Sequence, residues 1–292
     1  MSLKEESDKM ITPEEEAYIL EKAYVPEHIV SLMALISKGE PFLVEDHFGL
    51  VKDNWLILVG YPLDQRFSIE RSEKMIEQLF KEFRPEILWF IGPEIPASLL
   101  NTCQERETDQ YYRLDLGKVK VKASLKREVD KASRELTIER GLSISKEHEA
   151  LVSELSKREK LQPRVRELYR AMPDYIGHSS TAFVLNARDR KGRLCAFYVV
   201  DLAAKGFTTY LLGTHSKKNY VPHASDLLFS EMIKLTREHG KDIINLGLGV
   251  NKGIRRFKEK WGGVPFLNYE FCEHRPGSTI ISSMIGILEG KL

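Results

Sequence analysis

The densest group of potentially reactive side chains lies between Asn245 and Gly263. The segment NKGIRRFKEKWGG follows an apolar run ending in Gly247-Leu248-Gly249, and it carries five basic residues against one acidic residue. Glycines at a strand end let a ligand approach the backbone, and a helix that begins there turns its positive end toward an anion. A solvated helix face would also explain the charges, but the position favours binding of an anionic ligand.

Lys258 has the most informative place in this predicted helix. Ile254, Phe257 and Trp261 recur at three- and four-residue spacing and predict the buried stripe. Lys258 lies about 100° around the axis from Phe257, where a long side chain buries its stem and projects its ammonium into an adjoining cleft. Lys252 and Arg255 are predicted near the same edge, so the three cations can converge on one anion.

A second candidate site is the segment THSKKNYVPHASD, which leads from a predicted strand into a helix over residues 225–239. Lys217, Lys218 and the amides around Ala224 and Ser225, at the positive helix end, predict a cradle for a phosphate or carboxylate. Ser225 is also a good N-cap with Asp226 in the first turn, so an ordinary capped loop is the competing interpretation.

Other polar residues give weaker signals. His215 ends the strand that should border a cleft, and Tyr210 and Asn245 lie near the same opening. Each is an ordinary structural residue in the competing interpretation. His178 and His223 show no metal-ligand spacing with Cys, Asp or Glu, and no Ser-His-Asp or Cys-His set can be assembled from sequence order. We therefore expect no metal.

The elements that position these residues repeat along the chain. Residues 68–116 and 225–271 share the order amphipathic helix, buried strand, short helix and aromatic strand, each preceded by antiparallel strand pairs. This predicts a mixed α/β (α+β) fold of two similar domains, each with a splayed central strand pair that admits a ligand. The predicted parts are a helical lead-in over 1–40, a degenerate N-terminal domain over 41–135, a C-terminal domain with the active site over 136–275, and a helix over 276–292 that packs on the N-terminal domain.

Composition limits the classes of partner. The 292 residues carry a formal charge of +1, which provides no global attraction to nucleic acid or to an anionic membrane. Three widely spaced cysteines (Cys103, Cys195, Cys272) predict reduced thiols and a cytoplasmic location. The charged N-terminus and short apolar runs predict neither secretion nor membrane insertion.

Three stretches carry a resemblance to a known family. YYRLDLGKVKVKASLKREVDKASRE is similar to the Fem pattern of an LDL strand and a basic helix. NYVPHASDLLFSEMIKLTREHGKDIINLGLG resembles the loop, long helix and glycine-ended strand, and NKGIRRFKEKWGG resembles the Fem helix with its F-K and aromatic-Gly positions. The chain thus resembles the Fem-type aminoacyl- and acyl-transferases, a branch of the GNAT fold with two tandem GNAT-like domains.

The resemblance implies residues for each role, and it has departures. The glycine-rich loop that holds the CoA diphosphate in ordinary GNAT enzymes is replaced here by residues without glycine, and the place of the usual leaving-group tyrosine falls on Lys258, as in the Fem pattern. Lys258 and His215 are the implied catalytic residues. The implied donor-binding residues are Lys217, Lys218, Asn219, Tyr220, His223, Ala224 and Ser225. The implied substrate-binding residues are Tyr210, Asn245, Asn251, Lys252 and Arg255.

The reaction that the resemblance implies is transfer of an acyl or aminoacyl group from acyl-CoA or aminoacyl-tRNA to a primary amine. Backbone N–H groups at Leu211-Leu212-Gly213 are expected to bind the developing oxyanion, and His215 or a held water to act as base. The acceptor is a small molecule, a peptidoglycan precursor or a protein. Two alternatives stay open: a plain acetyl-CoA-dependent acetyltransferase, and a binding protein that kept the fold without the chemistry.

Overall fold

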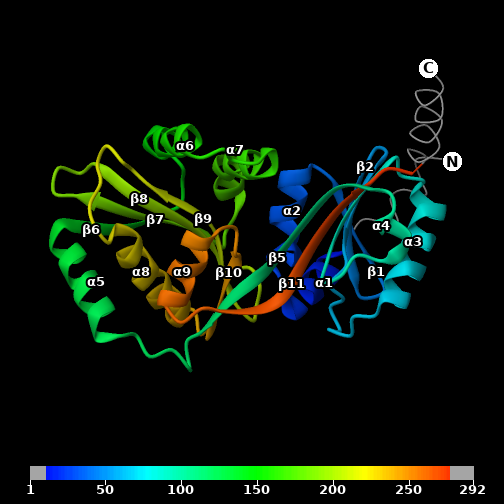
Figure 1. The fold of residues 1–292 in the computed structure, drawn as a ribbon, viewed down its shortest axis with the longest axis horizontal. Helices are drawn as coiled ribbons and strands as arrows, with labels where there is room; N and C mark the ends of the chain where they lie inside the picture. The colour runs from blue at the N-terminus through cyan, green and yellow to red at the C-terminus, as the bar shows by residue number, and fades with distance from the viewer. Residues whose placement is uncertain (1–10, 277–292) are drawn as a thin grey trace, which may run out of the picture. The chain divides into compact units, whose positions relative to one another are not determined.

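The computed structural model describes residues 11–276, which divide into two compact units. Unit 1 contains residues 11–19, 37–110 and 267–276, and unit 2 contains residues 20–36 and 111–266. Two strands, β5 (Cys103–Asp115) and β11 (Val264–His274), contribute residues to both units (Figure 1).

Unit 1 is built on a mainly antiparallel sheet. Its strand order is β1-β2-β3-β4-β11-β5, and β3 and β4 form a parallel pair with Trp55 opposite Ile87. The helix between them begins after Ser68, whose hydroxyl caps the Arg71 amide, and it ends at Arg84 in the left-handed region (φ 47°) just before Pro85. Its elements are α1 (Pro13–Lys22, which continues into unit 2), β1 (Glu40–Val44), β2 (His47–Lys52), β3 (Trp55–Val59), α3 (Ile69–Phe83), β4 (Ile87–Gly92) and α4 (Ala97–Leu100).

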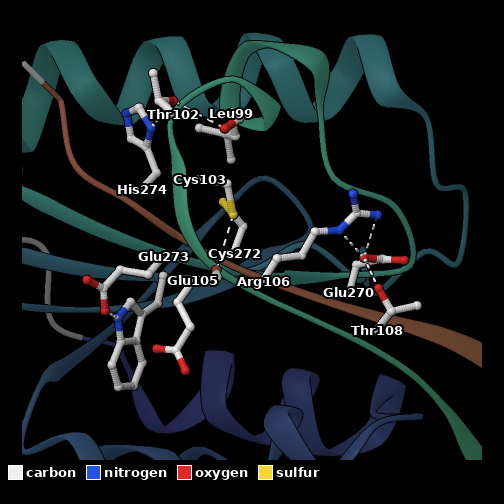
Figure 2. Close-up of a disulfide and its surroundings, with 11 residues drawn as sticks. Leu99, Thr102, Cys103, Glu105, Arg106, Thr108, Glu270, Cys272, Glu273 and His274 are labelled. Carbon is white, nitrogen blue, oxygen red and sulfur yellow. Dashed lines mark hydrogen bonds and ion pairs between the residues drawn. A yellow bond between two sulfur atoms is a disulfide. The ribbon is translucent and has the colours of Figure 1, made fainter. Parts of the chain in front are cut away.

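Cys103 and Cys272 form a disulfide in unit 1, which corrects the prediction of reduced thiols. The two Cα atoms are 5.5 Å apart, although 169 residues separate the cysteines along the chain (Figure 2). Only the pairing of β5 beside β11 brings them together, so their spacing in the sequence could not indicate the bond. The third cysteine, Cys195, is free and buried. The thiol argument for a cytoplasmic location is therefore removed.

Unit 2 contains the region with the candidate site. Its strand order is β5-β10-β9-β8-β7-β6, and all neighbouring strands are antiparallel except β9 and β10. Its elements are η2 (Pro26–His28), α2 (Val30–Ser37), α5 (Ala123–Glu135), β6 (Leu136–Gly141), α6 (Lys146–Arg158), α7 (Pro163–His178), β7 (Ala182–Asp189), β8 (Leu194–Asp201), β9 (Thr208–His215), α8 (Ala224–Glu238), β10 (Ile243–Leu248) and α9 (Lys252–Lys260).

Helices cover both faces of the unit 2 sheet (Figure 1). On one face α5 and α8 pack on the sheet, with Leu125, Leu228 and Met232 in one apolar cluster. On the other face α2, α6 and α7 enclose a second cluster that includes Leu32 and Met172. The strands between them read as continuous apolar runs because both of their faces are buried; every residue of β8 is buried.

The repeated order predicted from the sequence is present. The chain runs α3-β4-α4-β5 in the first half and α8-β10-α9-β11 in the second. In each half an antiparallel strand leads through a helix to a parallel strand, β3 to β4 and β9 to β10.

The last strand of each repeat pairs outside its own repeat. β5 pairs with β10, and β11 pairs with β4. This exchange explains why the compact units differ from the segments 41–135 and 136–275. Helix α5 belongs to unit 2, although its residues lie in the segment 41–135 predicted as the N-terminal domain.

Two further expectations concern the chain ends and membranes. The predicted C-terminal helix over 276–292 lies outside the described residues, apart from Pro276. Within residues 11–276, none of the helices combines the length and apolar character that a membrane crossing requires.

Candidate active site

The centre of the candidate site is the point where β9 and β10 separate. These parallel strands pair only at Thr208–Ile244 and Thr209–Asn245. Beyond that point β9 has an irregular register between its pairs with Val199 and Val200, and β10 is irregular between Asn245 and Leu248. The two strands therefore leave backbone groups that do not pair with each other, at residues that include the predicted oxyanion donors 211–213.

Asn245 and Gly247 shape the β10 side of the opening. The buried Asn245 side chain accepts a hydrogen bond from the Gly247 amide (2.9 Å) and donates one to the Tyr24 carbonyl (3.4 Å). Gly247 has φ 70°, a conformation that glycine adopts without steric cost. Asn245 thus holds the bent end of β10 in place.

Lys258 lies next to this opening and is buried, as the helical periodicity predicts. Only 4% of its surface is exposed. Its Nζ donates a hydrogen bond to the Leu248 carbonyl (2.5 Å) and lies 5.6 Å from the centre of the Tyr112 ring. Trp261 is buried and Phe257 partly buried in the core of unit 2, so the stripe of α9 anchors the helix. The result is an ammonium fixed at the carboxyl end of β10.

The other predicted residues of α9 have different environments. Asn251 caps the helix by accepting a hydrogen bond from the Ile254 amide (3.0 Å), which is a structural role. Lys252 and Arg255 are exposed, whereas Lys258 is buried. The structure therefore does not enclose the three cations in one site.

The loop after β9 holds a carboxylate of the protein itself. Glu154 of α6 accepts hydrogen bonds from the Lys217 amide (2.9 Å) and the Ser216 hydroxyl (3.1 Å). Partial burial would raise the pKa of Glu154, but these bonds and one from the Lys218 amide outweigh it and lower the pKa. The side chains of Lys217 and Lys218 are exposed. The backbone amides of Lys217 and Lys218, at the start of the predicted cradle, therefore bind a carboxylate of the protein itself.

A second internal carboxylate lies at the start of α8. The helix begins at Ala224, and its N-cap is His223 in the left-handed region, not Ser225 as predicted. The buried Asp226 accepts hydrogen bonds from Lys260 Nζ (2.9 Å) and Trp261 Nε1 (3.0 Å), and its Oδ2 lies 3.2 Å from His223 Nδ1. Tyr198 donates a hydrogen bond to the Ser225 carbonyl (3.0 Å). At this end of the predicted cradle, too, a carboxylate of the protein itself is present, and it is held by Lys260 and Trp261.

The same network contains the one group of three potential metal ligands among the described residues. Glu128, His223 and Asp226 offer atoms within 4.8 Å of one another. Lys260 Nζ, however, lies 2.8 Å from Glu128 and 2.9 Å from Asp226. Burial alone would lower the pKa of Lys260, but the two carboxylates outweigh it and raise the pKa. An ammonium thus supplies the positive charge here, and the cluster is an ion-pair network joining α5, α8 and α9.

His215 and Tyr210 lie on β9. His215 is partly buried, and its ring is 6.0 Å from that of Tyr220. Burial, assisted by the positive charge of Arg158, lowers the pKa of His215. Tyr210 packs edge-on against Tyr198 at 4.9 Å, and burial raises its pKa. His215 is therefore neutral at physiological pH and can accept a proton, whereas Tyr210 stays protonated.

A pocket of about 310 Å³ opens on the face of unit 2 that carries α6 and α7. Phe197 of β8 and Leu212 of β9 line it, and Tyr169 at its wall donates a hydrogen bond to the Gly213 carbonyl (3.1 Å). Arg166 and Arg170 add positive charge to mainly apolar walls. The pocket thus adjoins the strand that carries the predicted oxyanion donors.

Comparison with known proteins identifies the fold. No protein-family model matches the sequence, and no curated protein has significant similarity to it. Among solved structures, L-PGS from Bacillus licheniformis superposes with a TM-score of 0.58 and 17% identity over 95% of this chain and 96% of its own. FemX gives 0.59 and 11% identity over 89% and 96%. A tandem GNAT protein from the clavulanic acid biosynthesis pathway gives 0.50 and 14% identity over 79% and 78%.

The chain has the tandem GNAT fold. In this fold, the separation of β9 and β10 is the splayed central strand pair that the repeat predicted. The carboxylate of Glu154 was missed, and Asp226 was noted only as a residue of the first helical turn. A Glu in a long charged helix gives no local signal, since only the tertiary contact shows that Glu154 binds a loop 63 residues later.

Proposed function

We propose that the protein is an N-acyltransferase that moves an acyl or aminoacyl group from acyl-CoA or aminoacyl-tRNA to a primary amine. The observation that supports this most is the buried Lys258 ammonium at the point where β9 and β10 separate in a tandem GNAT fold. Attack on a carbonyl needs hydrogen-bond donors for the oxyanion and a positive group for the departing carrier. The opening can offer both.

The roles follow from position. The carbonyl of the donor enters between β9 and β10, where backbone N–H groups of residues 211–213 bind its oxygen. The amine approaches to about 3–3.5 Å from the carbonyl carbon. Lys258 then stabilises the negative charge on the leaving thiolate or hydroxyl oxygen.

The proposed donor-binding loop, residues 216–225, would bind an anion in a different way from the glycine-rich loop that holds a diphosphate through its backbone amides. Because Glu154 and Asp226 engage groups at its two ends, we propose that the side chains of Lys217 and Lys218 meet the anionic part of the donor. His223, Asn219 and Tyr220 border the same segment. Such a site relies on flexible ammonium groups more than on backbone amides.

We place the acceptor on the face of the unit 2 sheet that carries α6 and α7, opposite the face covered by α8. The pocket beside Leu212 has mainly apolar walls with Arg166, Arg170 and Glu149 among its lining residues, and it suits the part of an acceptor molecule away from the reacting amine. The acceptor amine would then reach the opening from this pocket.

Donor screening tests the proposal. The purified protein is incubated with radiolabelled acetyl-CoA or aminoacyl-tRNA and a panel of primary amines, and amide products are counted. Thermal shift with CoA, acetyl-CoA and aminoacyl-tRNA is measured in parallel, since a ligand of the native state raises the melting temperature. Transfer from acetyl-CoA alone identifies a plain acetyltransferase. Absence of both transfer and shift for every donor would reject the enzyme and leave the binding protein.

A further inference from the structure

Glu27 lies beside the opening, on a segment far from the other site residues in sequence. It is the central residue of η2, in unit 2. The Tyr24 carbonyl of this turn accepts the hydrogen bond from Asn245, and the Tyr24 amide donates to His28 Nδ1 (3.4 Å). Val25 and Ile29, on either side of Glu27, are fully buried. The backbone around Glu27 is therefore fixed against the end of β10.

The carboxylate of Glu27 has an unusual environment. Its Oε2 atom is buried and has no hydrogen-bond partner among the described residues. The Tyr111 hydroxyl interacts with the carboxylate, and Tyr111 itself is 1% exposed and pairs with Leu248. No ion pair to Glu27 is found within residues 11–276. Glu27 as a whole is partly buried, but a carboxylate oxygen that is buried without a cation disfavours the charged form, and an ammonium ligand would supply the missing positive charge.

Glu27 and Lys258 reach β10 from opposite faces of the sheet. Tyr111 and Tyr112 are adjacent in β5, so their side chains point to opposite faces. Glu27 interacts with Tyr111, and Lys258 lies over the ring of Tyr112 and bonds to Leu248. The separated strand end thus has a carboxylate on one side and an ammonium on the other. An ammonium ligand and an anionic ligand would be drawn to different faces.

From this arrangement we infer that Glu27 binds the ammonium group of the acceptor and accepts its proton. The inference rests on the proposed acyltransferase function. One N–H proton passes to Glu27, and the neutral amine nitrogen forms a bond to the carbonyl carbon. The bond from that carbon to the carrier sulfur or oxygen breaks, and the departing atom takes a second proton from the nitrogen. The amide keeps the third proton, and Glu27 releases its own to solvent.

The electrostatic environment suits this role. Burial raises the pKa of Glu27, and the nearby Tyr111 hydroxyl partly opposes the rise. The titratable group that acts on it is Tyr111 of β5. A carboxylate with a raised pKa is a stronger base, closer to the pKa that general base catalysis at neutral pH requires.

The decisive experiment compares E27Q with wild type and with E21Q, an exposed glutamate on the same segment. With the donor that supports transfer, E27Q should lower kcat/KM by at least about 100-fold, and the acidic limb of its pH profile should disappear. E21Q should retain both. Y111F removes the hydroxyl whose interaction lowers the Glu27 pKa, so it should move the acidic limb to higher pH. Unchanged kcat/KM in E27Q overturns the inference.

A second readout does not depend on activity. Because the folded-state pKa of Glu27 is raised, its charge destabilises the native state above that pKa, and the penalty vanishes below the unfolded value. E27Q should therefore melt a few degrees higher than wild type at about pH 8, and the difference should disappear at about pH 4. If wild type transfers nothing, the proposed function fails, and the stability result then shows separately whether Glu27 is a carboxylate whose charge destabilises the native state. A lower melting temperature of E27Q at pH 8 overturns it.

Discussion

The ammonium of Lys258 lies 2.5 Å from the carbonyl oxygen of Leu248, the last residue of β10. A lysine on a helix and the end of a neighbouring strand are thus joined at the point where the sheet opens. This hydrogen bond fixes the position of the Lys258 ammonium, whereas the sequence predicts only that Lys258 borders the apolar stripe of its helix. It also gives Lys258 a structural role that any test of catalysis must separate from chemistry.

Replacing Lys258 by Met tests its role in the reaction. Met keeps much of the apolar stem and removes the charge, so transfer should fall by a factor of about 100 or more if Lys258 stabilises the leaving group. The Leu248 carbonyl loses its donor, which should lower the free energy of unfolding by about 1–3 kcal/mol. Steady-state kinetics and denaturant melts measure the two effects. R256M, on the exposed side of α9, is the control and should change neither.

The loop lysines are tested by charge reversal. The double variant K217E/K218E should weaken binding of the anionic donor and flatten its salt dependence, because exposed charges act over about 10 Å at 0.1 M salt. Titration of the donor at two salt concentrations measures this. K120E/K126E carries the same charge change on exposed residues elsewhere in unit 2 and should bind as wild type does. Equal affinities of the two variants would leave the loop only a capping role.

Glu154 should make stability depend on pH in a defined direction. Its folded-state pKa is lowered, so its contribution is present above the unfolded pKa and is lost as pH falls through the folded value. E154Q should unfold at lower denaturant than wild type at about pH 7, and the two proteins should converge at about pH 3. The exposed Glu149 of the same helix provides the control, and E149Q should unfold with wild type at both pH values. A constant difference between E154Q and wild type at both pH values would contradict the assignment.

The disulfide is tested by reduction. A bond between Cys103 and Cys272 closes a loop of 169 residues and should stabilise the protein by about 2–5 kcal/mol. Dithiothreitol should therefore lower the melting temperature of wild type and leave the double variant C103S/C272S unchanged. Thiol labelling of the unfolded, unreduced protein should modify one cysteine, Cys195. Three labelled cysteines would show that the bond is absent.

Much of the local structure follows from sequence periodicity. The apolar stripe of Ile254, Phe257 and Trp261 defines α9 and places Lys258 at its buried border. The repeated order of helix and strand predicts the tandem fold. Apolar residues recur every three to four positions in each helix and every two positions in a half-buried strand, so each element can be recognised separately. The resemblance of NKGIRRFKEKWGG to the Fem pattern directs attention to the same helix. These patterns depend only on residues that are close together in the chain, so they can be recognised without the tertiary structure.

The tertiary structure decides the contacts between distant segments. The exchange of β5 and β11 between repeats, the Cys103–Cys272 bond and the binding of Glu154 to the loop after β9 join residues far apart in the chain. Glu27 reaches the opening only because residues 20–36 pack in unit 2. Each contact forms because several helices and strands bury apolar surface against one another. The local sequence pattern does not indicate which carboxylate will then accept a hydrogen bond from which amide.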